Sequence, residues 1–280
     1  MRVNAAVSCL LLCPISTAAL AQATPSPTNA PAPEASEQSQ RKQAIVLLRD
    51  TGGNQLGSGV LMAETNGGYW LATNRHVVEE QKAVCVQTVD RRVITALVLP
   101  PAKAAVSAEL DLALLWMPAA GANRLAVAYT GPTSTPATAL PLVVATGYPA
   151  PLQLNPEDPN YTEDSGLLVP LLKQPLQGGF DLAYTSEVQK GMSGGGLFIG
   201  RQLIGINGAH SKPLWPGQWL SESGKPVPDD LNRKLELVSL GISLRTIQQV
   251  LQQYVEPRTK DLKVLAGVKC QASTGALTRF

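Results

Sequence analysis

The chain has 280 residues, 44% of them hydrophobic, so it can build one large domain or two small ones around buried cores. Its formal net charge is only +2, and no basic stretch interleaves with aromatic residues, which argues against nucleic acid as a partner. No apolar run reaches the ~18 residues of a membrane span, so we expect no membrane-spanning segment in the mature chain.

The first 22 residues have the pattern of a secretory signal peptide. Arg2 provides a positive charge, residues 5–20 are mainly apolar, and the strings ALA and AQA at 19–23 are typical of a cleavage site. A buried N-terminal helix is the alternative interpretation. We expect an exported protein, either periplasmic or extracellular.

Residues 23–40 are rich in Pro, Ala and Ser and contain no large apolar side chain. Such a segment cannot bury enough surface to offset its ordering entropy, so we expect a disordered linker. Short β-like runs separated by Gly, Pro, Asn or charged residues follow. They form two groups, over 41–124 and 125–255, and the second opens with the run LAVAY at 125–129. This pattern predicts an all-β chain of two barrels.

A helix is expected at the end of the second group, within SLRTIQQVLQQYV. Its apolar residues recur at helical spacing and would share one face; they are Leu244, Ile247, Val250, Leu251 and Tyr254. Residues 256–280 form a polar tail beyond it.

Two cysteines, Cys85 and Cys270, remain once the expected signal peptide is removed with Cys9 and Cys13. Disulfides persist in the compartments that exported proteins reach, so these two residues either form a bridge or are separate thiols.

Three stretches carry residues with catalytic potential: LATNRHVV with His76, ELDLALLWM with Asp111, and KGMSGGGLF with Ser193. A serine hydroxyl becomes a useful nucleophile only when a base removes its proton and N–H donors face the developing oxyanion. A neutral histidine can be that base, and a carboxylate can fix its tautomer. The N–H groups of Gly191 and Ser193 are the candidate donors, because a glycine can adopt the backbone conformation that turns its N–H outward.

Each of these residues also has a simpler interpretation. His76 could be a surface imidazole, Asp111 a solvent-facing residue at the start of a strand, and the string GMSGG a flexible turn. The three simple interpretations fit poorly together, because the stretches occur in the chain order His, Asp, Ser, each at the edge of a predicted strand.

These motifs resemble those of the trypsin-like (chymotrypsin-fold) serine endopeptidases, particularly the bacterial branch that includes the HtrA-type proteases. Further similarities are GSGV at 57–60, GYP at 147–149 and LIGING at 203–208. The resemblance covers about 45–255. It implies two antiparallel six-stranded β-barrels with the site between them, followed by the C-terminal helix.

The resemblance also implies a role for each matching residue. His76 would be the general base, Asp111 its orienting carboxylate and Ser193 the nucleophile, with Gly191 and Ser193 forming the oxyanion hole. Residues of the strand that pairs with the substrate backbone would be Gly208, Ala209 and His210.

Several features depart from the family pattern or extend it. Met192 stands where the digestive enzymes carry an aspartate that binds a freed N-terminus, so we expect no activation by N-terminal insertion. Most HtrA-type enzymes continue into a PDZ domain, but only about 70 residues follow LIGING here, so we expect no PDZ domain. Glu187 falls where the family often builds the wall of the specificity pocket.

The segment 211–234 is a long polar insertion whose Trp215 and Trp219 would either bind substrate or pack the loop.

The sequence therefore predicts a serine endopeptidase that acts on protein or peptide substrates. Two alternatives remain open: an inactive member of the fold that binds peptides in the cell envelope, and a structural β-protein. We expect no metal or organic cofactor, because two histidines and two mature cysteines do not form a cluster with the spacing of a metal site. The pattern does not indicate an oligomeric state.

Overall fold

The computed structural model describes most of the chain after the expected signal peptide. The described ranges are 33–65, 67–101, 109–119, 124–131, 140–150, 160–209, 217–258 and 261–271. All of them belong to one compact unit, residues 32–280. None of the helices in these ranges is both long enough and apolar enough to cross a membrane. The expected signal peptide and residues 23–32 of the expected linker lie outside the described residues.

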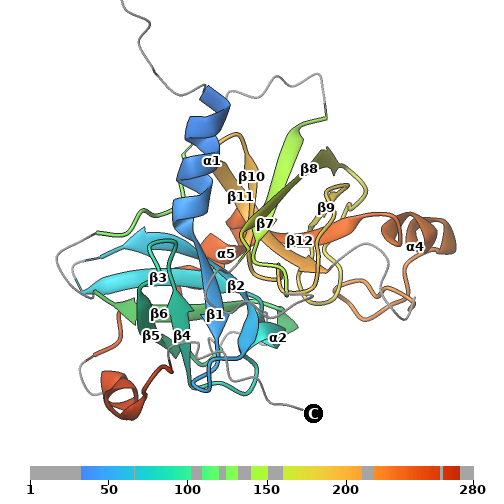
Figure 1. Cartoon of the computed structure of the whole chain (residues 1–280). Helices are drawn as coiled ribbons and strands as arrows, with labels where there is room; N and C mark the ends of the chain where they lie inside the picture. Colours follow the sequence, from blue (N-terminus) through green and yellow to red (C-terminus); the bar gives the residue numbers. More distant parts are fainter. Residues whose placement is uncertain are drawn as a thin grey trace, which may run out of the picture. The chain divides into compact units, whose positions relative to one another are not determined.

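Twelve strands form two closed antiparallel barrels (Figure 1). Strands of the first barrel are β1 (Ile45–Arg49), β2 (Gln55–Glu64), β3 (Gly68–Thr73), β4 (Ala83–Gln87), β5 (Val93–Val98) and β6 (Ala113–Pro118). Strands of the second are β7 (Leu142–Gly147), β8 (Thr162–Val169), β9 (Leu182–Tyr184), β10 (Gly196–Ile199), β11 (Gln202–Ala209) and β12 (Ser239–Ser243).

The two barrels have the same connectivity. Around the first barrel the strands run in the order β1-β2-β3-β6-β5-β4, and around the second in the order β7-β8-β9-β12-β11-β10. Every neighbouring pair is antiparallel. The predicted all-β fold of two six-stranded barrels is therefore confirmed.

One hydrophobic cluster continues from the first barrel into the second. It includes Leu47 of β1, Phe198 of β10 and Ile247 of the helix α5 (Leu244–Leu251), all essentially inaccessible to water. Strands such as β1 are buried along their whole length, which explains why they appear in the sequence as continuous apolar runs rather than alternating ones. This shared core fixes the junction of the two barrels.

The predicted C-terminal helix is present but shorter than its apolar pattern. Helix α5 begins after Ser243, whose hydroxyl accepts a hydrogen bond from the Thr246 N–H and so caps the helix. Ile247 and Val250 are buried on the predicted face. Tyr254 lies beyond the end of the helix, where its hydroxyl donates to Pro100 O over 2.8 Å.

The run LAVAY, expected to be a strand, is instead a connector between the barrels. The Ala128 N–H donates to Leu61 O in the first barrel, and Tyr129 O accepts from the Leu203 N–H in the second. Only Tyr129 forms an isolated bridge, with Gln202. Because its successive residues bond to different barrels, the segment cannot extend a ladder with either one.

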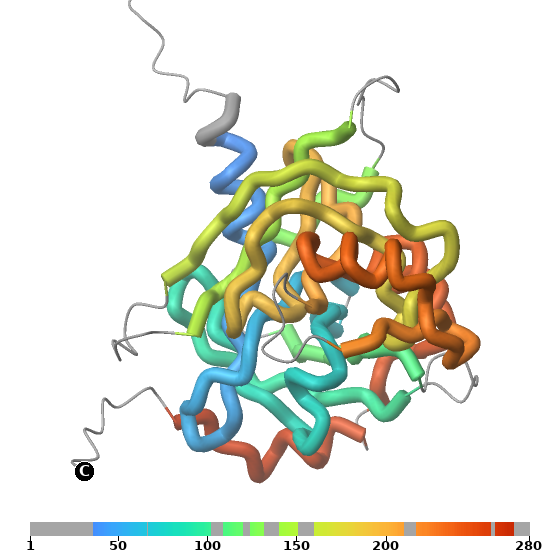
Figure 2. The backbone as a smooth tube through the Cα atoms, turned by 90° about the vertical axis from the view of Figure 1, so that its right-hand side faces the viewer, coloured from blue at the N-terminus to red at the C-terminus, as the bar shows by residue number. Residues whose placement is uncertain are grey.

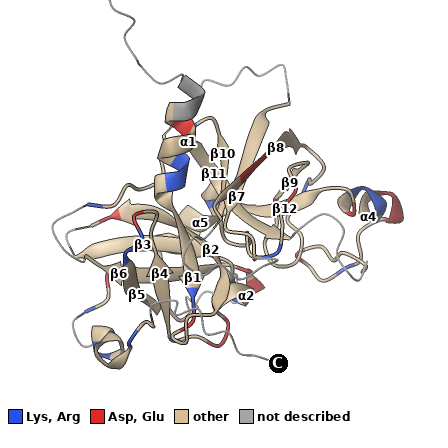
Figure 3. Cartoon of the chain, in the orientation of Figure 1, with Lys and Arg blue, Asp and Glu red and all other residues tan. Residues whose placement is uncertain are grey.

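The linker expectation is wrong for residues 33–40, which belong to the helix α1 (Pro33–Ala44). After Pro33 the segment consists largely of good helix formers, and proline is well suited to the first turn. Arg41 holds the helix against the second barrel: its guanidinium bonds both carboxylate oxygens of Glu163 and donates to Gly200 O over 2.7 Å. Figure 3 shows both charge signs on α1 and α4 (Asp229–Leu235), whereas most of the barrel strands carry neither.

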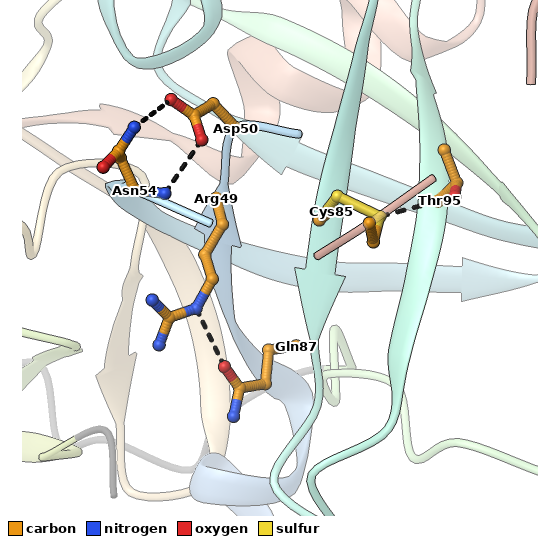
Figure 4. Close-up of a disulfide and its surroundings, with 7 residues drawn as sticks. Arg49, Asp50, Asn54, Cys85, Gln87 and Thr95 are labelled. Carbon is orange, nitrogen blue, oxygen red and sulfur yellow. Dashed lines mark hydrogen bonds between the residues drawn. A yellow bond between two sulfur atoms is a disulfide. The ribbon is translucent and has the colours of Figure 1, made fainter. Parts of the chain in front are cut away.

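The polar tail is attached to the first barrel. It contains the 3₁₀ helix η1 (Asp261–Gly267), and the red C-terminal tube runs beneath the cyan strands in Figure 2. Cys270 forms a disulfide with Cys85 of β4, beside Thr95 of β5 (Figure 4). Of the two interpretations left open for these cysteines, the structure adopts the bridge.

Candidate active site

His76 and Asp111 form a tightly bonded pair at the edge of the first barrel. The chain leaves β3 through Asn74 and enters the one-turn helix α2 (Arg75–Val78), which carries His76. Asp111 lies just before β6, and its carboxylate accepts from the His76 backbone N–H over 3.0 Å and contacts His76 Nδ1 over 2.8 Å. Because an ionised carboxylate can only accept, Nδ1 carries the proton and Nε2 keeps its lone pair.

The backbone N–H and carbonyl of Asp111 are also hydrogen-bonded. The side-chain amide of Asn74 donates to Asp111 O over 3.0 Å, and the Asp111 N–H donates to Gly178 O of the second barrel over 2.8 Å. The Asp111 side chain is only 16% exposed, whereas that of His76 is 49% exposed. Asp111 therefore fixes the Nδ1 side of the imidazole, and the rest of the ring is accessible to solvent and to a reacting partner.

The electrostatics of the pair suit a base that operates near neutral pH. The hydrogen bond to Asp111 raises the pKa of His76 above its ordinary value, and the carboxylate charge acts in the same direction, while partial burial opposes both. The hydrogen bond is the largest of these effects. Asp111 thus makes His76 a stronger base than a free imidazole.

Ser193 lies in a sharp turn between the barrels, just before β10. Gly191 and Gly194 have φ angles of 96° and 80°, a region that favours glycine. A side chain on Gly194 would also overlap the Thr73 hydroxyl and Ser58 O, both of the first barrel. The repeated glycines of GMSGG therefore have two physical causes: the left-handed backbone conformation and the close approach of the other barrel.

The turn that carries Ser193 lies next to helix α2, which carries His76. The Ser58 N–H donates to Ser193 O over 2.9 Å. A side chain built on the neighbouring Gly57 would meet Val77 of α2 at 2.9 Å and Ser193 O at 3.2 Å. The structure thus brings His76, Asp111 and Ser193 into one region at the barrel junction.

The hydroxyl of Ser193 is not bonded to the imidazole. It donates to Gly208 O over 3.4 Å, and no Ser193–His76 hydrogen bond occurs between these two described residues. Gly208 is at a bulge, because the β11–β12 ladder shifts register between Asn207 and Ala209. Catalytic hydrogen bonds are often long or absent before substrate binds, so this geometry is compatible with a resting site.

The candidate oxyanion donors are unengaged. Neither the Gly191 N–H nor the Ser193 N–H donates a hydrogen bond within the described part of the chain. By contrast, the N–H groups of Met192, Gly194 and Gly195 are all bonded to backbone carbonyls. The turn therefore leaves free the two N–H groups that the sequence singles out.

The remaining candidate residues have different outcomes. Gly208 and Ala209 end β11 beside the Ser193 hydroxyl, whereas His210 lies outside the described residues. Glu187 is exposed, and its N–H donates to Asp164, so the structure gives no support for a pocket wall at this position. The Met192 side chain is completely buried in an apolar cluster.

The insertion is less polar than its sequence suggests. Trp215 is outside the described residues, whereas Trp219 packs edge-on against Phe180 with ring centroids 6.3 Å apart. Val227 is buried, and so is Leu235, the residue that follows the insertion. Trp219 also lines a cavity of about 380 Å³. The other residues around this cavity are Arg75, Glu109, Asp111, Gln177, Gly178, Gln218 and Leu220.

Two buried polar residues near the site were not singled out from the sequence. Asn207 donates to Thr146 O over 2.8 Å and accepts from the Tyr184 hydroxyl over 3.0 Å. Ser58 bonds to Gly191 O in the turn that carries Ser193 and is fully buried. Ser58 lies in the string GSGV and Asn207 in LIGING. In each string a polar residue stands among apolar residues and glycines, and this was the only sign in the sequence that the residue could matter.

Comparisons with known proteins agree with this geometry. The chain matches the model of the trypsin-like peptidase domain over residues 57–206, and it therefore belongs to that family. Among solved structures, it resembles one described as "HtrA-type protease AlgW with tripeptide", with a TM-score of 0.55 and 22% identity. The match covers 80% of this chain and 64% of the other, so the chain spans just under two thirds of that protein. At this identity the likeness establishes the fold. No curated protein matches the chain.

Proposed function

We propose that this chain is a serine endopeptidase that cleaves protein or peptide substrates through an acyl-enzyme on Ser193. The observation that carries the proposal is the double hydrogen bond from His76 to the Asp111 carboxylate, which leaves Nε2 as a base. The adjacent Ser193 turn, with two unengaged N–H groups, supports the same reaction.

In the proposed mechanism, Nε2 of His76 takes the proton of the Ser193 hydroxyl as Oγ forms a bond to the substrate carbonyl carbon. The carbonyl oxygen becomes an oxyanion that accepts from the N–H groups of Gly191 and Ser193. The imidazolium, stabilised by Asp111, then donates its proton to the amine as the C–N bond breaks. A water molecule adds to the acyl-enzyme by the same route and releases the acid.

The proposed reaction requires no metal or organic cofactor. Substrate would pair with the end of β11, at Gly208 and Ala209, and with His210, which follows them in the sequence. We also propose export to the periplasm or cell exterior by the expected signal peptide of residues 1–22. The Cys85–Cys270 disulfide supports this localisation, because such bonds persist in oxidising compartments.

A second candidate function is an inactive member of the fold that binds peptides. The observation that favours it is the Ser193 hydroxyl, which bonds to Gly208 O rather than to His76. If the hydroxyl stayed there with substrate bound, the base would have no proton to remove. The two candidates differ in the partner of the Ser193 hydroxyl when substrate is bound, so the test must address reactivity.

The test is reaction with a fluorophosphonate probe, followed by the mass of the intact protein. Wild type should gain one probe per molecule and cleave casein, whereas Ser193→Ala should fold and do neither. Loss of the nucleophile removes all but the residual catalysis from binding and the oxyanion hole, a decrease of several orders of magnitude. An unlabelled, inactive wild type would favour the binding module. Equal casein cleavage by Ser193→Ala would contradict the assignment of the nucleophile.

A further inference from the structure

Ser58, a fully buried residue of β2, bonds to the turn that carries Ser193 from the opposite barrel. Its hydroxyl donates to Gly191 O over 2.8 Å, and its N–H donates to Ser193 O over 2.9 Å. Its own carbonyl accepts from the Thr73 hydroxyl over 2.7 Å. One residue of the first barrel therefore hydrogen-bonds to the turn on both sides of Met192, at Gly191 and at Ser193.

The Ser58 hydroxyl has a defined direction. It accepts from the Tyr148 N–H over 2.9 Å, so its own proton is available to Gly191 O. Gln55, three residues earlier in β2, donates its side-chain amide to Tyr148 O over 2.7 Å. Both backbone groups of Tyr148 are thus held by side chains of the same strand.

These bonds fix the two peptide planes that flank Gly191. The carbonyl of the plane before it, Lys190 O, accepts from the Ala150 N–H over 2.7 Å, in the segment that Ser58 and Gln55 hold. The carbonyl of the plane after it, Gly191 O, accepts from Ser58 itself. In a trans peptide the N–H points opposite to the carbonyl, so the Gly191 N–H points away from Ala150 and remains unbonded.

We infer that Ser58 is a positioning residue for acyl transfer at Ser193, because it keeps the oxyanion hole formed before substrate arrives. Without its hydroxyl, Gly191 O loses its side-chain donor, and the Gly191–Met192 peptide keeps only the bond from the Met192 N–H to Gln189 O. The Tyr148 N–H also loses its acceptor, which loosens the segment whose Ala150 N–H holds Lys190 O. If the Lys190–Gly191 peptide then rotated, it would withdraw the Gly191 N–H from the oxyanion or face the oxyanion with Lys190 O, which destabilises the transition state. This inference rests on the proposed function and adds to it a residue from the other barrel.

The experiment compares Ser58→Ala with wild type by two measurements. The first is the second-order rate of phosphonylation by the fluorophosphonate probe, measured against pH. The second is kcat and KM on a peptide that spans a cleavage site mapped in casein. The loss of a complete oxyanion-hole donor costs about 10²–10³ in kcat, so we expect a decrease in kcat of at least about tenfold, up to that limit.

KM and the pH midpoint of phosphonylation should change little, because the substrate strand and the His76–Asp111 pair are untouched. A purely structural role would instead lower the melting temperature while folded enzyme kept its kcat. The matched control is Thr88→Val, which removes the hydroxyl of a buried residue that bonds to the Asp90 carboxylate and to Arg92 O in the β4–β5 turn. This control should keep the wild-type kcat.

If Ser58→Ala does not fold, Ser58→Cys replaces it, because it keeps the size of the side chain with a weaker donor, and its kcat should also fall. An active wild type with unchanged kcat and phosphonylation rate in the folded Ser58 variant would overturn the inference while leaving the proposed function intact. A decrease confined to KM would also overturn it. Absence of labelling in wild type would overturn the proposed function, and this inference with it.

Discussion

Removal of the Cys85–Cys270 disulfide should destabilise the fold strongly. The bond joins residues separated by 185 positions, so it closes a very long loop in the unfolded chain. The chain-entropy model gives a loss of conformational entropy worth about 5 kcal/mol for a loop of this length. Measured effects are commonly about 2–4 kcal/mol, and we expect the present bond to fall within or just above that range.

The contacts of the tail explain why little would replace the bond. No residue of η1 is buried, although Leu262 and Leu265 pack partly against the core. Beyond η1, the Gln271 N–H donates to Thr51 O over a long 3.4 Å. Cys85 itself is 1% exposed in β4, so a free thiol there would remain packed as a small apolar group.

The best variant is therefore Cys270→Ser, which removes the bond at its half-buried end and leaves the barrel intact. A domain of this size loses about 2–4 °C of Tm per kcal/mol, so the loss should be roughly 5–15 °C. Thermal melts with and without reductant provide the assay. Reductant should lower the Tm of wild type but not that of the variant. A variant that melts within 1 °C of oxidised wild type would refute the reasoning. The cross-link would then contribute no measurable stability through the conformational entropy of the unfolded chain.

Two further predictions concern charged groups. The acid limb of kcat/KM should have its midpoint above the ordinary histidine pKa of about 6.5, because the Asp111 hydrogen bond raises the pKa of His76 and only the neutral imidazole is a base. The residual activity of Asp111→Asn should show a lower midpoint, and an unchanged one would contradict this electrostatic argument. Arg41→Ala should cost about 3–5 kcal/mol in denaturant unfolding, because it leaves the largely buried Glu163 without its cation. Arg41→Met combined with Glu163→Gln should recover part of this loss, whereas Arg124→Ala, at an exposed ion pair, should cost less than about 1 kcal/mol.

The sign of the histidine effect on stability follows from the same shift. A raised pKa means that folded His76 holds its proton more tightly than unfolded His76 does. Its contribution to stability is therefore fully present below the unfolded pKa, and is lost as the pH rises through the raised pKa of the folded state. Activity and this contribution to stability should consequently change in opposite directions over the same pH range.

The sequence alone was sufficient for the features that depend on local patterns. Apolar runs separated by turn residues predicted the two barrels, and the helical spacing of apolar residues predicted α5. The backbone demands of a sharp turn explain why Gly191 and Gly194 mark the position of Ser193. These features are readable because their causes, side-chain periodicity and allowed backbone angles, act within a few residues.

Other features depended on partners distant in the chain. Helix α1 looks like a linker until Arg41 meets Glu163, 122 residues away, because a polar segment of that length gains little from helix propensity alone. LAVAY looks like a strand until its residues bond to two different barrels. The hydroxyl of Ser58 has no visible role until the barrels close and bring it to Gly191, 133 residues later. Composition can suggest that such groups matter, but only the packing of the two barrels decides which buried hydrogen bonds they make, because an unpaired polar group in a core is too costly to remain.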